Sequence, residues 1–325
     1  MKMNRLFSFF IIIIIVWSCG SDDDDGVDTE FLESILSLTD VSADNDAELQ
    51  EYFRTHFYNY EEFANPPADF DFKIVIDTIS GDNADKRPLL DDVTFKTFTV
   101  STGDFNSEIE EENDVPHKIY FLVAREGSNL NRPTLGDNTI LRYEGSLLDG
   151  TIFDTATAPI SFYPPNLIRG FAIGLTEFNT GSVITENGDG TLDFGIHGIG
   201  AVFIPSGLAY FFGTGPSNTD GSPGLPQYAN LIFKIDNLSF QQNTDFDGDG
   251  IPSIMEDLNG DGNLNNDNTD EDLEGNFVFT PNHVDPDDDG DGILTIDEIE
   301  INADGTITFP DSDGDGIVDY LDSDS

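Results

Sequence analysis

The sequence is poor in cysteine, histidine and basic residues, and each shortage excludes a class of function. One cysteine among 325 residues allows no disulfide within the chain and no zinc cluster built on thiolates. The four histidines are scattered, which is typical of packing or surface residues rather than of a metal site. Lys and Arg number 13 against 64 Asp and Glu, and the formal net charge is -51. This charge excludes nucleic acid as a partner, because binding to phosphates requires basic side chains.

The apolar content is nevertheless sufficient for a folded protein. Hydrophobic residues make up 38% of the chain, and 325 residues suit two or three domains. The charge is concentrated toward the C-terminus, where residues 245–325 contain neither Lys nor Arg. We therefore expect a globular part that is followed by an acidic, cation-binding part.

The first 18 residues are typical of a bacterial export signal. Lys2 and Arg5 precede an apolar run with five consecutive isoleucines, which is too short for a comfortable membrane span. The only cysteine, Cys19, stands at the end of this run. The arrangement resembles a lipobox, although Trp17 is an atypical residue there; the alternative is an ordinary secretory signal with a stray cysteine. We expect residues 1–18 to be a signal peptide and Cys19 to carry a lipid.

A short acidic tether, residues 19–26, follows the signal. It resembles the surface-export signal of Bacteroidetes lipoproteins, and a simple solvated tether is the other interpretation. Acyl chains on Cys19 would hold the protein at a membrane by burying methylene groups. The sequence thus predicts a lipid-anchored protein of the bacterial outer membrane or cell surface.

Residues 27–115 form an N-terminal extension without a catalytic constellation. Apolar residues at helical spacing predict a helix over residues 46–57. Alternating apolar and polar residues predict half-buried strands over residues 70–76 and 93–100. We expect these strands to extend or pack on the next domain.

Residues 116–241 contain the elements of a recognisable domain. Residues 117–126 alternate like a strand, and residues 139–154 form two strands joined at Asp149-Gly150, a strong hairpin signal. Further blocks follow in order: Leu-Ile-Arg-Gly-Phe, then Pro-x-x-x-Ala-Tyr, then Gly-Leu-Pro-x-x-Ala-x-Leu-x-Phe. Each block alone is a weak signal, but their ordered sum is specific. Together they resemble the FKBP family of peptidyl-prolyl cis/trans isomerases.

The resemblance implies an α+β fold, in which an antiparallel sheet wraps around one helix, and an enzyme that acts on X-Pro bonds of polypeptides. Isomerisation needs no cofactor, nucleophile or proton relay, because only the resonance of one amide has to be broken. A water-poor pocket favours the twisted amide, and hydrogen bonds to that form add to the effect. The resemblance places seven catalytic residues around the pocket: Tyr143, Phe153, Asp154, Ile168, Phe171, Tyr210 and Phe233.

The resemblance also gives each residue a role. Phe171 is the floor for the proline ring, in place of the family's usual Trp, and Tyr143, Phe153 and Phe233 are the walls. Asp154 presents its carboxylate to the twisting carbonyl and accepts a hydrogen bond from Tyr143. The Ile168 N–H and the Tyr210 hydroxyl hold flanking substrate carbonyls. The substrate-binding apolar rim is completed by Leu167 and Leu225.

Three departures from the family pattern leave a second interpretation open. Phe171 replaces the usual Trp, and no Arg follows Asp154 to pair with it. An insertion, residues 182–200, is rich in Gly, and we expect it to form an extra hairpin beside the pocket. The alternative function is therefore a binding module on an inactive isomerase fold, assembling at the cell surface through calcium-binding repeats.

The acidic segment, residues 242–325, contains three loops with the spacing of an EF-hand-type calcium site. Oxygen-bearing side chains recur at positions 1, 3, 5, 9 and 12, with Gly at position 6 for the sharp turn. The first, second and third loops (residues 245–256, 287–298 and 311–322) supply Asp245, Asp247, Asp249, Ser253, Glu256; Asp287, Asp289, Asp291, Thr295, Glu298; and Asp311, Asp313, Asp315, Asp319, Asp322.

Hard oxygen ligands of this kind select Ca²⁺. Helices that could flank each loop are missing from the pattern, so the segment resembles thrombospondin type 3 repeats more than paired EF-hands. Because apolar residues are few, we expect folding of the segment to depend on the metal. The predicted role of Ca²⁺ is structural, as a stiff stalk or contact surface, and the alternative is an acidic solubilising tail.

Overall fold

The computed structural model describes residues 36–105, 111–214, 224–271, 273 and 279–324. The predicted signal peptide, Cys19 and the acidic tether lie outside the described residues. Within the described ranges, no helix has both the length and the apolar character that a membrane span requires.

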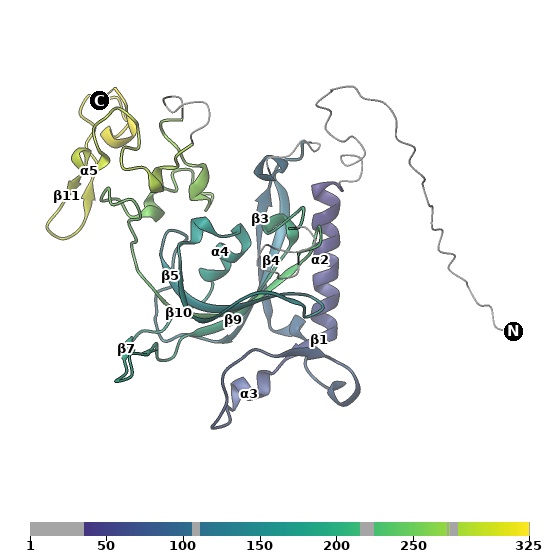
Figure 1. Cartoon of the computed structure of the whole chain (residues 1–325). Helices are drawn as coiled ribbons and strands as arrows, with labels where there is room; N and C mark the ends of the chain where they lie inside the picture. Colours follow the sequence, from purple (N-terminus) through teal and green to yellow (C-terminus); the bar gives the residue numbers. More distant parts are fainter. Residues whose placement is uncertain (1–35, 106–110, 215–223, 272, 274–278, 325) are drawn as a thin grey trace, which may run out of the picture. The chain divides into compact units, whose positions relative to one another are not determined.

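The centre of the fold is a six-stranded sheet with the order β3-β4-β9-β10-β5-β6, in which every neighbouring pair is antiparallel (Figure 1). Its strands are β3 (Val93–Val100), β4 (Val115–Arg125), β5 (Thr139–Leu147), β6 (Ile152–Phe162), β9 (Gly198–Ile204) and β10 (Leu231–Phe240). The predicted hairpin is confirmed: the Leu147 N–H donates to the Thr151 carbonyl at 2.9 Å, and Gly150 occupies the left-handed region with φ of 86°.

The remaining elements are short apart from one helix. The α-helices are α2 (Leu38–Thr55), α3 (Tyr60–Ala64), α4 (Arg169–Leu175) and α5 (Thr295–Glu298). Small two-stranded sheets pair β1 (His56–Tyr58) with β2 (Ile76–Thr78), β7 (Thr185–Glu186) with β8 (Leu192–Asp193), and β11 (Glu300–Ile301) with β12 (Ile307–Thr308). The 3-10 helices are Gly81–Asn83, Leu89–Asp91, Thr102–Phe105, Pro164–Asn166, Ser206–Leu208, Ser253–Glu256, Leu264–Asn266, Asn282–Val284 and Asp319–Leu321. The predicted α+β class is confirmed.

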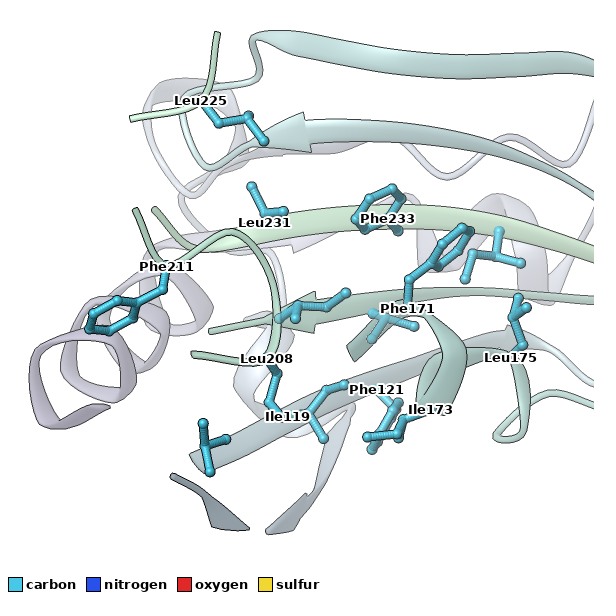
Figure 2. Packing of buried hydrophobic residues seen from close by; sticks show 14 of the residues in the cluster. Ile119, Phe121, Phe171, Ile173, Leu175, Leu208, Phe211, Leu225, Leu231 and Phe233 are labelled. Atoms are coloured by element: carbon cyan, nitrogen blue, oxygen red, sulfur yellow. The ribbon is translucent and has the colours of Figure 1, made fainter. Parts of the chain in front are cut away.

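Successive side chains of each strand point to opposite faces of the sheet, and the two faces contribute to two different hydrophobic clusters. One face packs on α4, and its apolar side chains meet the helix in the cluster of Figure 2. Two glycines let α4 approach β9 closely: a Cβ on Gly170 would lie 2.2 Å from Ile204, and one on Gly174 would lie 2.6 Å from Val202. The other face packs on α2 through Leu49.

The N-terminal extension belongs to the same sheet. As expected, residues 93–100 form a strand, β3, which pairs with β4 from Val93↔Leu122 to Val100↔Val115. The other two predictions for the extension need correction. The helix starts at Leu38 rather than at residue 46, because the Ser37 hydroxyl caps it by accepting from the Asp40 N–H at 3.0 Å.

The strand predicted over residues 70–76 is wrong except at Ile76. Phe72 has φ of 58°, a left-handed conformation that a strand does not contain, and the Asp71 carboxylate accepts from the Lys73 N–H at 3.1 Å. The local side-chain hydrogen bond competes with the ladder, so the aromatic alternation here reflects loop packing.

The acidic segment consists of loops around a small core of Ile251, Ile299 and Tyr320. It packs on residues 163–168, which we call the β6–α4 connection. The rings of Tyr163 and Phe246 stack with centroids 4.1 Å apart, and the Tyr163 hydroxyl lies 2.9 Å from His283 Nδ1. The acidic segment is therefore in direct contact with the chain that leads into α4.

Candidate active site and metal-binding loops

Five aromatic rings, which we call the aromatic cluster, gather where α4 crosses β10 and β5. They belong to Tyr143, Phe153, Phe162, Phe171 and Phe233. Phe171 of α4 stacks on Phe233 of β10 with centroids 4.4 Å apart and planes at 15°, as Figure 2 shows. Phe153 meets Phe233 edge-on, with centroids 5.5 Å apart and planes at 86°. Four of the seven predicted catalytic residues are thus brought together by one helix and three strands.

Three polar groups stand at the edge of this cluster. The Tyr143 hydroxyl donates to the Asp154 carboxylate at 2.6 Å, and the Thr155 N–H donates to the same carboxylate at 2.8 Å. Burial raises the pKa of the Tyr143 phenol, and its hydrogen bond to Asp154 raises it further. Burial also raises the pKa of Tyr210, with a further contribution from the Asp154 charge. Both phenols therefore stay protonated at neutral pH, and the Tyr143 hydroxyl donates to the Asp154 carboxylate.

The remaining predicted catalytic residue, Ile168, is the N-cap of α4. Its carbonyl accepts from the Phe171 N–H at 2.9 Å and from the Ala172 N–H at 3.1 Å. Its own N–H has no acceptor among the described residues, so it is available to a ligand at the edge of the aromatic cluster.

Two of the three acidic loops share one hydrogen-bonding pattern at their glycines. In the first and third loops, the position 1 carboxylate accepts from both glycines of the turn: Asp245 from Gly248 and Gly250, and Asp311 from the corresponding pair. The carboxylates at positions 1, 3 and 5 offer oxygens that lie within 4.8 Å of one another in each of the three loops. The alternate spacing predicted from the sequence therefore gathers three carboxylates in every loop.

The side chains at position 9 close each loop on itself. Ser253, Thr295 and Asp319 each accept from the backbone N–H of position 2 of their own loop, at 3.2, 3.1 and 2.7 Å. Their role as metal ligands stays a prediction.

Sequence comparison relates part of the chain to named proteins. Peptidyl-prolyl cis-trans isomerase Mip of Coxiella burnetii is 29% identical over 135 residues, which are 40% of this chain and 46% of that protein. Probable FKBP-type peptidyl-prolyl cis-trans isomerase FkpA of Neisseria meningitidis serogroup B is 30% identical over 95 residues, 28% of this chain and 29% of that protein. The matched part of the chain is homologous to FKBP-type peptidyl-prolyl isomerases. The chain spans less than half the length of these two relatives.

Other similarities are more distant. The macrophage infectivity potentiator of Trypanosoma cruzi is 27% identical over 130 residues, 39% of this chain and 55% of that protein. Among solved structures, FkpA from Escherichia coli aligns at 21% identity with a TM-score of 0.31, covering 62% of this chain and 61% of that one. The BamM C-terminal family model matches residues 246–310, within the acidic segment. The resemblance of this segment to thrombospondin repeats stays a prediction.

The two residues predicted to complete the rim, Leu167 and Leu225, both contact the hydrophobic cluster that packs on α4. Leu225 is a buried member of the cluster, only 5% exposed. Leu167 is half-buried and lines a cavity of about 100 Å³ together with Leu264 of the acidic segment. Leu167 therefore faces the acidic segment as well as the core.

The insertion forms the predicted hairpin, from β7 and β8, although Gly198–Gly200 belongs to β9 instead. The Ser182 N–H donates to Ser128 Oγ at 3.0 Å. The N–H of Gly181, which directly precedes the insertion, donates to the Leu238 carbonyl at 3.0 Å. Leu238 is near the end of β10 that lies away from Phe233. The expected position beside the pocket has no supporting contact among the described residues.

Sequence reasoning missed Phe162, whose ring centroid lies 5.8 Å from Tyr143 and 6.4 Å from Phe171. The signal was present but weak: β6 continues past the Phe-Asp element, and its last residue returns to the α4 side through a bulge in the pairing with β5. A bulge cannot be located from residue alternation alone.

A cleft of about 360 Å³ lies against β5 and β10; it shares Tyr143 and Thr155 with the candidate site, and charged side chains make up much of the rest of its lining. Four of them form two ion pairs, Lys234–Glu144 and Arg142–Asp236, each at 2.9 Å. Such pairing is typical of a structural network, so the candidate active site remains the aromatic cluster with its polar edge.

Gly145 sets the space available to the aromatic cluster. A Cβ at this position would lie 2.8 Å from the Phe153 ring and 3.0 Å from the Phe233 ring. We expect Gly145→Ala to destabilise the protein by about 1–3 kcal/mol through overpacking and to distort the walls. Chemical denaturation measures the free energy of unfolding. The matched control is Gly188→Ala, where nothing lies within 4 Å of the new methyl group; equal stability of the two variants would contradict the expected crowding.

Several carboxylates of the acidic loops have raised pKa values because they are buried beside other carboxylates. The pKa of Glu256 rises to about 10, that of Asp288 to about 9, those of Asp247 and Glu298 to about 7, and that of Asp249 to about 6. In each case burial is the largest cause. The folded, metal-free segment therefore favours protonated carboxyls.

These shifts predict how metal-free protein responds to pH. A carboxyl with a raised pKa stabilises the folded state at low pH, and this contribution is lost as pH rises through the folded value. Burial lowers the pKa of His197 to about 4, so this residue makes the folded state more stable as pH rises. That increase ends near pH 6.5, the pKa of an unperturbed histidine, and does not affect the range above it. We expect the melting temperature in EDTA to fall by several degrees between pH 6.5 and pH 9.

The uncharged variant Glu256→Gln tests the cause of this fall, since it removes the carboxyl with the highest of these pKa values. Scanning calorimetry in EDTA should give a flatter pH profile for the variant than for the natural protein. A natural profile that rises over this pH range would show that the loop carboxylates do not control the stability of the segment.

Proposed function

We propose that this chain is a peptidyl-prolyl cis/trans isomerase that assists the folding of exported or surface polypeptides. The observation that carries the proposal is the Tyr143–Asp154 hydrogen bond of 2.6 Å beside the stacked Phe171 and Phe233 rings. Homology to FKBP-type isomerases over about a hundred residues supports it. No cofactor is needed for this reaction.

The residues divide the reaction between binding and stabilisation. The proline ring packs on Phe171, and the surrounding rings exclude water, which disfavours the charge-separated planar amide. As the bond to proline twists, its carbonyl turns toward the edge formed by Asp154 and the Tyr143 hydroxyl. The Ile168 N–H and the Tyr210 hydroxyl donate to the flanking carbonyls. Only interactions that strengthen in the twisted state accelerate the step.

We further propose that the mature chain is anchored through lipid on Cys19 at the outer membrane or cell surface. The position of the cysteine behind an apolar run supports this localisation. We propose Ca²⁺ as a structural ion of the acidic loops, since each loop gathers three carboxylate oxygens within 4.8 Å.

A second candidate is a peptide-binding module of low or no activity. Two observations favour it: Phe171 and Phe233 are each only 4% exposed, and the recorded hydrogen bonds to Asp154 come from Tyr143 and Thr155, none from Arg. A proline ring would have to displace the stacked rings in order to reach the floor.

The test is isomerisation of short X-Pro peptides, with varied residues before proline, by protein that begins at Gly20 and is kept in Ca²⁺. Uncatalysed isomerisation takes tens of seconds or longer at 25 °C, and acceleration over this rate establishes isomerase activity. Binding of such peptides by folded protein without acceleration would instead establish the binding module. Neither binding nor acceleration would reject both candidates.

A further inference from the structure

The acidic segment contains a carboxylate cluster that joins two predicted ligands of the first loop to an acid outside the loop spacing. One oxygen each from Asp249, Glu256 and Asp288 lie within 4.8 Å of one another. Asp249 and Glu256 belong to the first loop, whereas Asp288 belongs to the second. The cluster therefore joins two loops that are distant in sequence.

The three side chains are buried, and five of their six carboxylate oxygens lack hydrogen-bond partners among the described residues, since only Asp249 Oδ1 is engaged, by the Ile251 N–H at 2.7 Å. Their exposed fractions are 1%, 0% and 1% for Asp249, Glu256 and Asp288. Within the described residues, no donor stands in hydrogen-bonding geometry to Asp249 Oδ2 or to either carboxylate oxygen of Glu256 and Asp288. An ionised carboxylate buried in this way is strongly destabilising unless a cation accompanies it.

The chain itself supplies no such cation nearby. Residues 245–325 contain no Lys or Arg, and the ion pairs recorded for the described residues all lie before residue 245. Three like charges within 4.8 Å repel one another, so the arrangement is stable only with protons or with a bound positive ion.

Asp288 occupies position 2 of its loop, which the alternate ligand spacing does not use. Phe246 and Ser312 stand at the same position in the other two loops. The Asp288 N–H donates to Thr295 Oγ1 at 3.1 Å, which is the hydrogen bond that position 2 also makes in the other two loops. The Asp288 carboxylate, in contrast, lies beside Asp249 and Glu256 of the first loop. This carboxylate is therefore not needed to build its own loop.

The surroundings hold the two loops in this arrangement. Ile251, Ile299 and Tyr320 form the small apolar core of the segment, with one residue from the first loop, one that follows the second loop, and one from the third. Tyr320 also interacts electrostatically with Asp288, Glu256 and Asp249. The cluster is thus enclosed by all three loops and largely shielded from solvent.

We propose that a divalent cation of the calcium class binds between the first and second loops, with Asp249, Glu256 and Asp288 as its protein ligands. We call this position the inter-loop site. Three hard carboxylate ligands without any His or Cys select Ca²⁺ or a similar ion. The inference rests on the proposed calcium binding of the loops and is independent of isomerase activity.

The experiment titrates Ca²⁺ alone into metal-stripped protein that begins at Gly20, with calorimetry for affinity and native mass spectrometry for the number of ions bound. Asp288→Asn keeps the size of the side chain and removes its charge. We expect it to bind one ion fewer per chain, or to weaken one site at least tenfold. The matched control is Asp297→Asn, an exposed acid in the same segment, which should bind like the natural protein.

A second variant guards against misfolding of the first. Asp288→Ser places a serine at position 2 of the second loop, as Ser312 does in the third loop. The second loop should therefore still form in this variant. Hydrogen exchange adds a readout of loop coupling: Ca²⁺ should protect the Ile251 N–H in the natural protein and in the control, and protect it less in both Asp288 variants.

The outcomes separate the inter-loop site from calcium binding in general. If the natural protein binds no Ca²⁺, the proposed role of the loops fails together with this site. If the natural protein binds Ca²⁺ and both Asp288 variants keep its stoichiometry, affinities and protection, the inter-loop site alone is overturned. Loss of one ion in the Asp288 variants but not in Asp297→Asn establishes it.

Discussion

Asp154→Asn is expected to lower kcat/KM for X-Pro peptides by about ten- to hundredfold, the equivalent of losing a charged hydrogen bond worth roughly 1.5–3 kcal/mol. The carboxylate is exposed and accepts from the Tyr143 hydroxyl at 2.6 Å, so its charge serves the polar edge of the pocket rather than the core. The amide keeps the shape of the side chain, and the free energy of unfolding should change little.

Phe233→Leu and Phe233→Ala test the apolar part of the same pocket. The Phe233 ring stacks on Phe171 at 4.4 Å and meets Phe153 edge-on at 5.5 Å, and it is 4% exposed. Truncation to alanine also costs about 3–5 kcal/mol of stability, so the leucine variant is the cleaner probe. We expect at least a tenfold fall in kcat/KM for Phe233→Leu, about 1.4 kcal/mol at the transition state.

The control for both positions is Phe95→Ala, which truncates an aromatic residue that is 56% exposed on β3. Its kcat/KM should equal that of the natural protein. Natural activity in Asp154→Asn and in Phe233→Leu together would place the catalytic site elsewhere and remove the basis of the proposed mechanism. Loss in Phe95→Ala as well would indicate a general effect on folding.

The parts of the fold that the sequence predicted are those with local signals. The Asp149-Gly150 turn places Gly150 at φ of 86°, and these two adjacent residues are sufficient to predict the turn. Residues 93–100 alternate, and they form an edge strand beside β4. The ordered blocks of the FKBP resemblance then identified residues far apart in sequence, such as Tyr143 and Phe233, whose rings lie 6.0 Å apart. That proximity follows from topology, not from spacing.

The parts that were missed depend on contacts between distant segments. Helix α2 begins at Leu38, where the Glu112 carboxylate accepts from the Thr39 N–H at 3.1 Å, and no local pattern reports such a partner. Phe72 alternates as in a strand, yet its ring lies 4.4 Å from the Arg125 guanidinium, which anchors a loop. Asp288 was not among the predicted ligands, because a pattern confined to one loop cannot indicate partners in another loop.

Removal of calcium is expected to have the largest effect on the acidic segment and on the β6–α4 connection. A free Ca²⁺ concentration of a hundred times the dissociation constant stabilises the folded state by about 2.7 kcal/mol for each site. At alkaline pH, where the buried carboxyls lose their protons, chelation should therefore unfold the loops, whose apolar core is very small. The connection then loses the Tyr163–Phe246 stack at 4.1 Å and the hydrogen bond from Asn265 to the Pro165 carbonyl at 2.8 Å. Hydrogen exchange should accelerate throughout residues 244–324 and also at residues 163–168.

The internal control is the pairing of β3 with β4, which involves none of these loops and should exchange at the same rate with Ca²⁺ or EDTA. Because the Ile168 N–H lies at the end of the loosened connection, we expect chelation also to raise KM for X-Pro peptides more than it lowers kcat. Exchange confined to residues 244–324, with unchanged KM, would show that the loops fold on calcium without supporting the pocket. Unchanged exchange in the loops themselves would contradict a structural role for the metal, since such a segment cannot keep its buried carboxylates together without a cation.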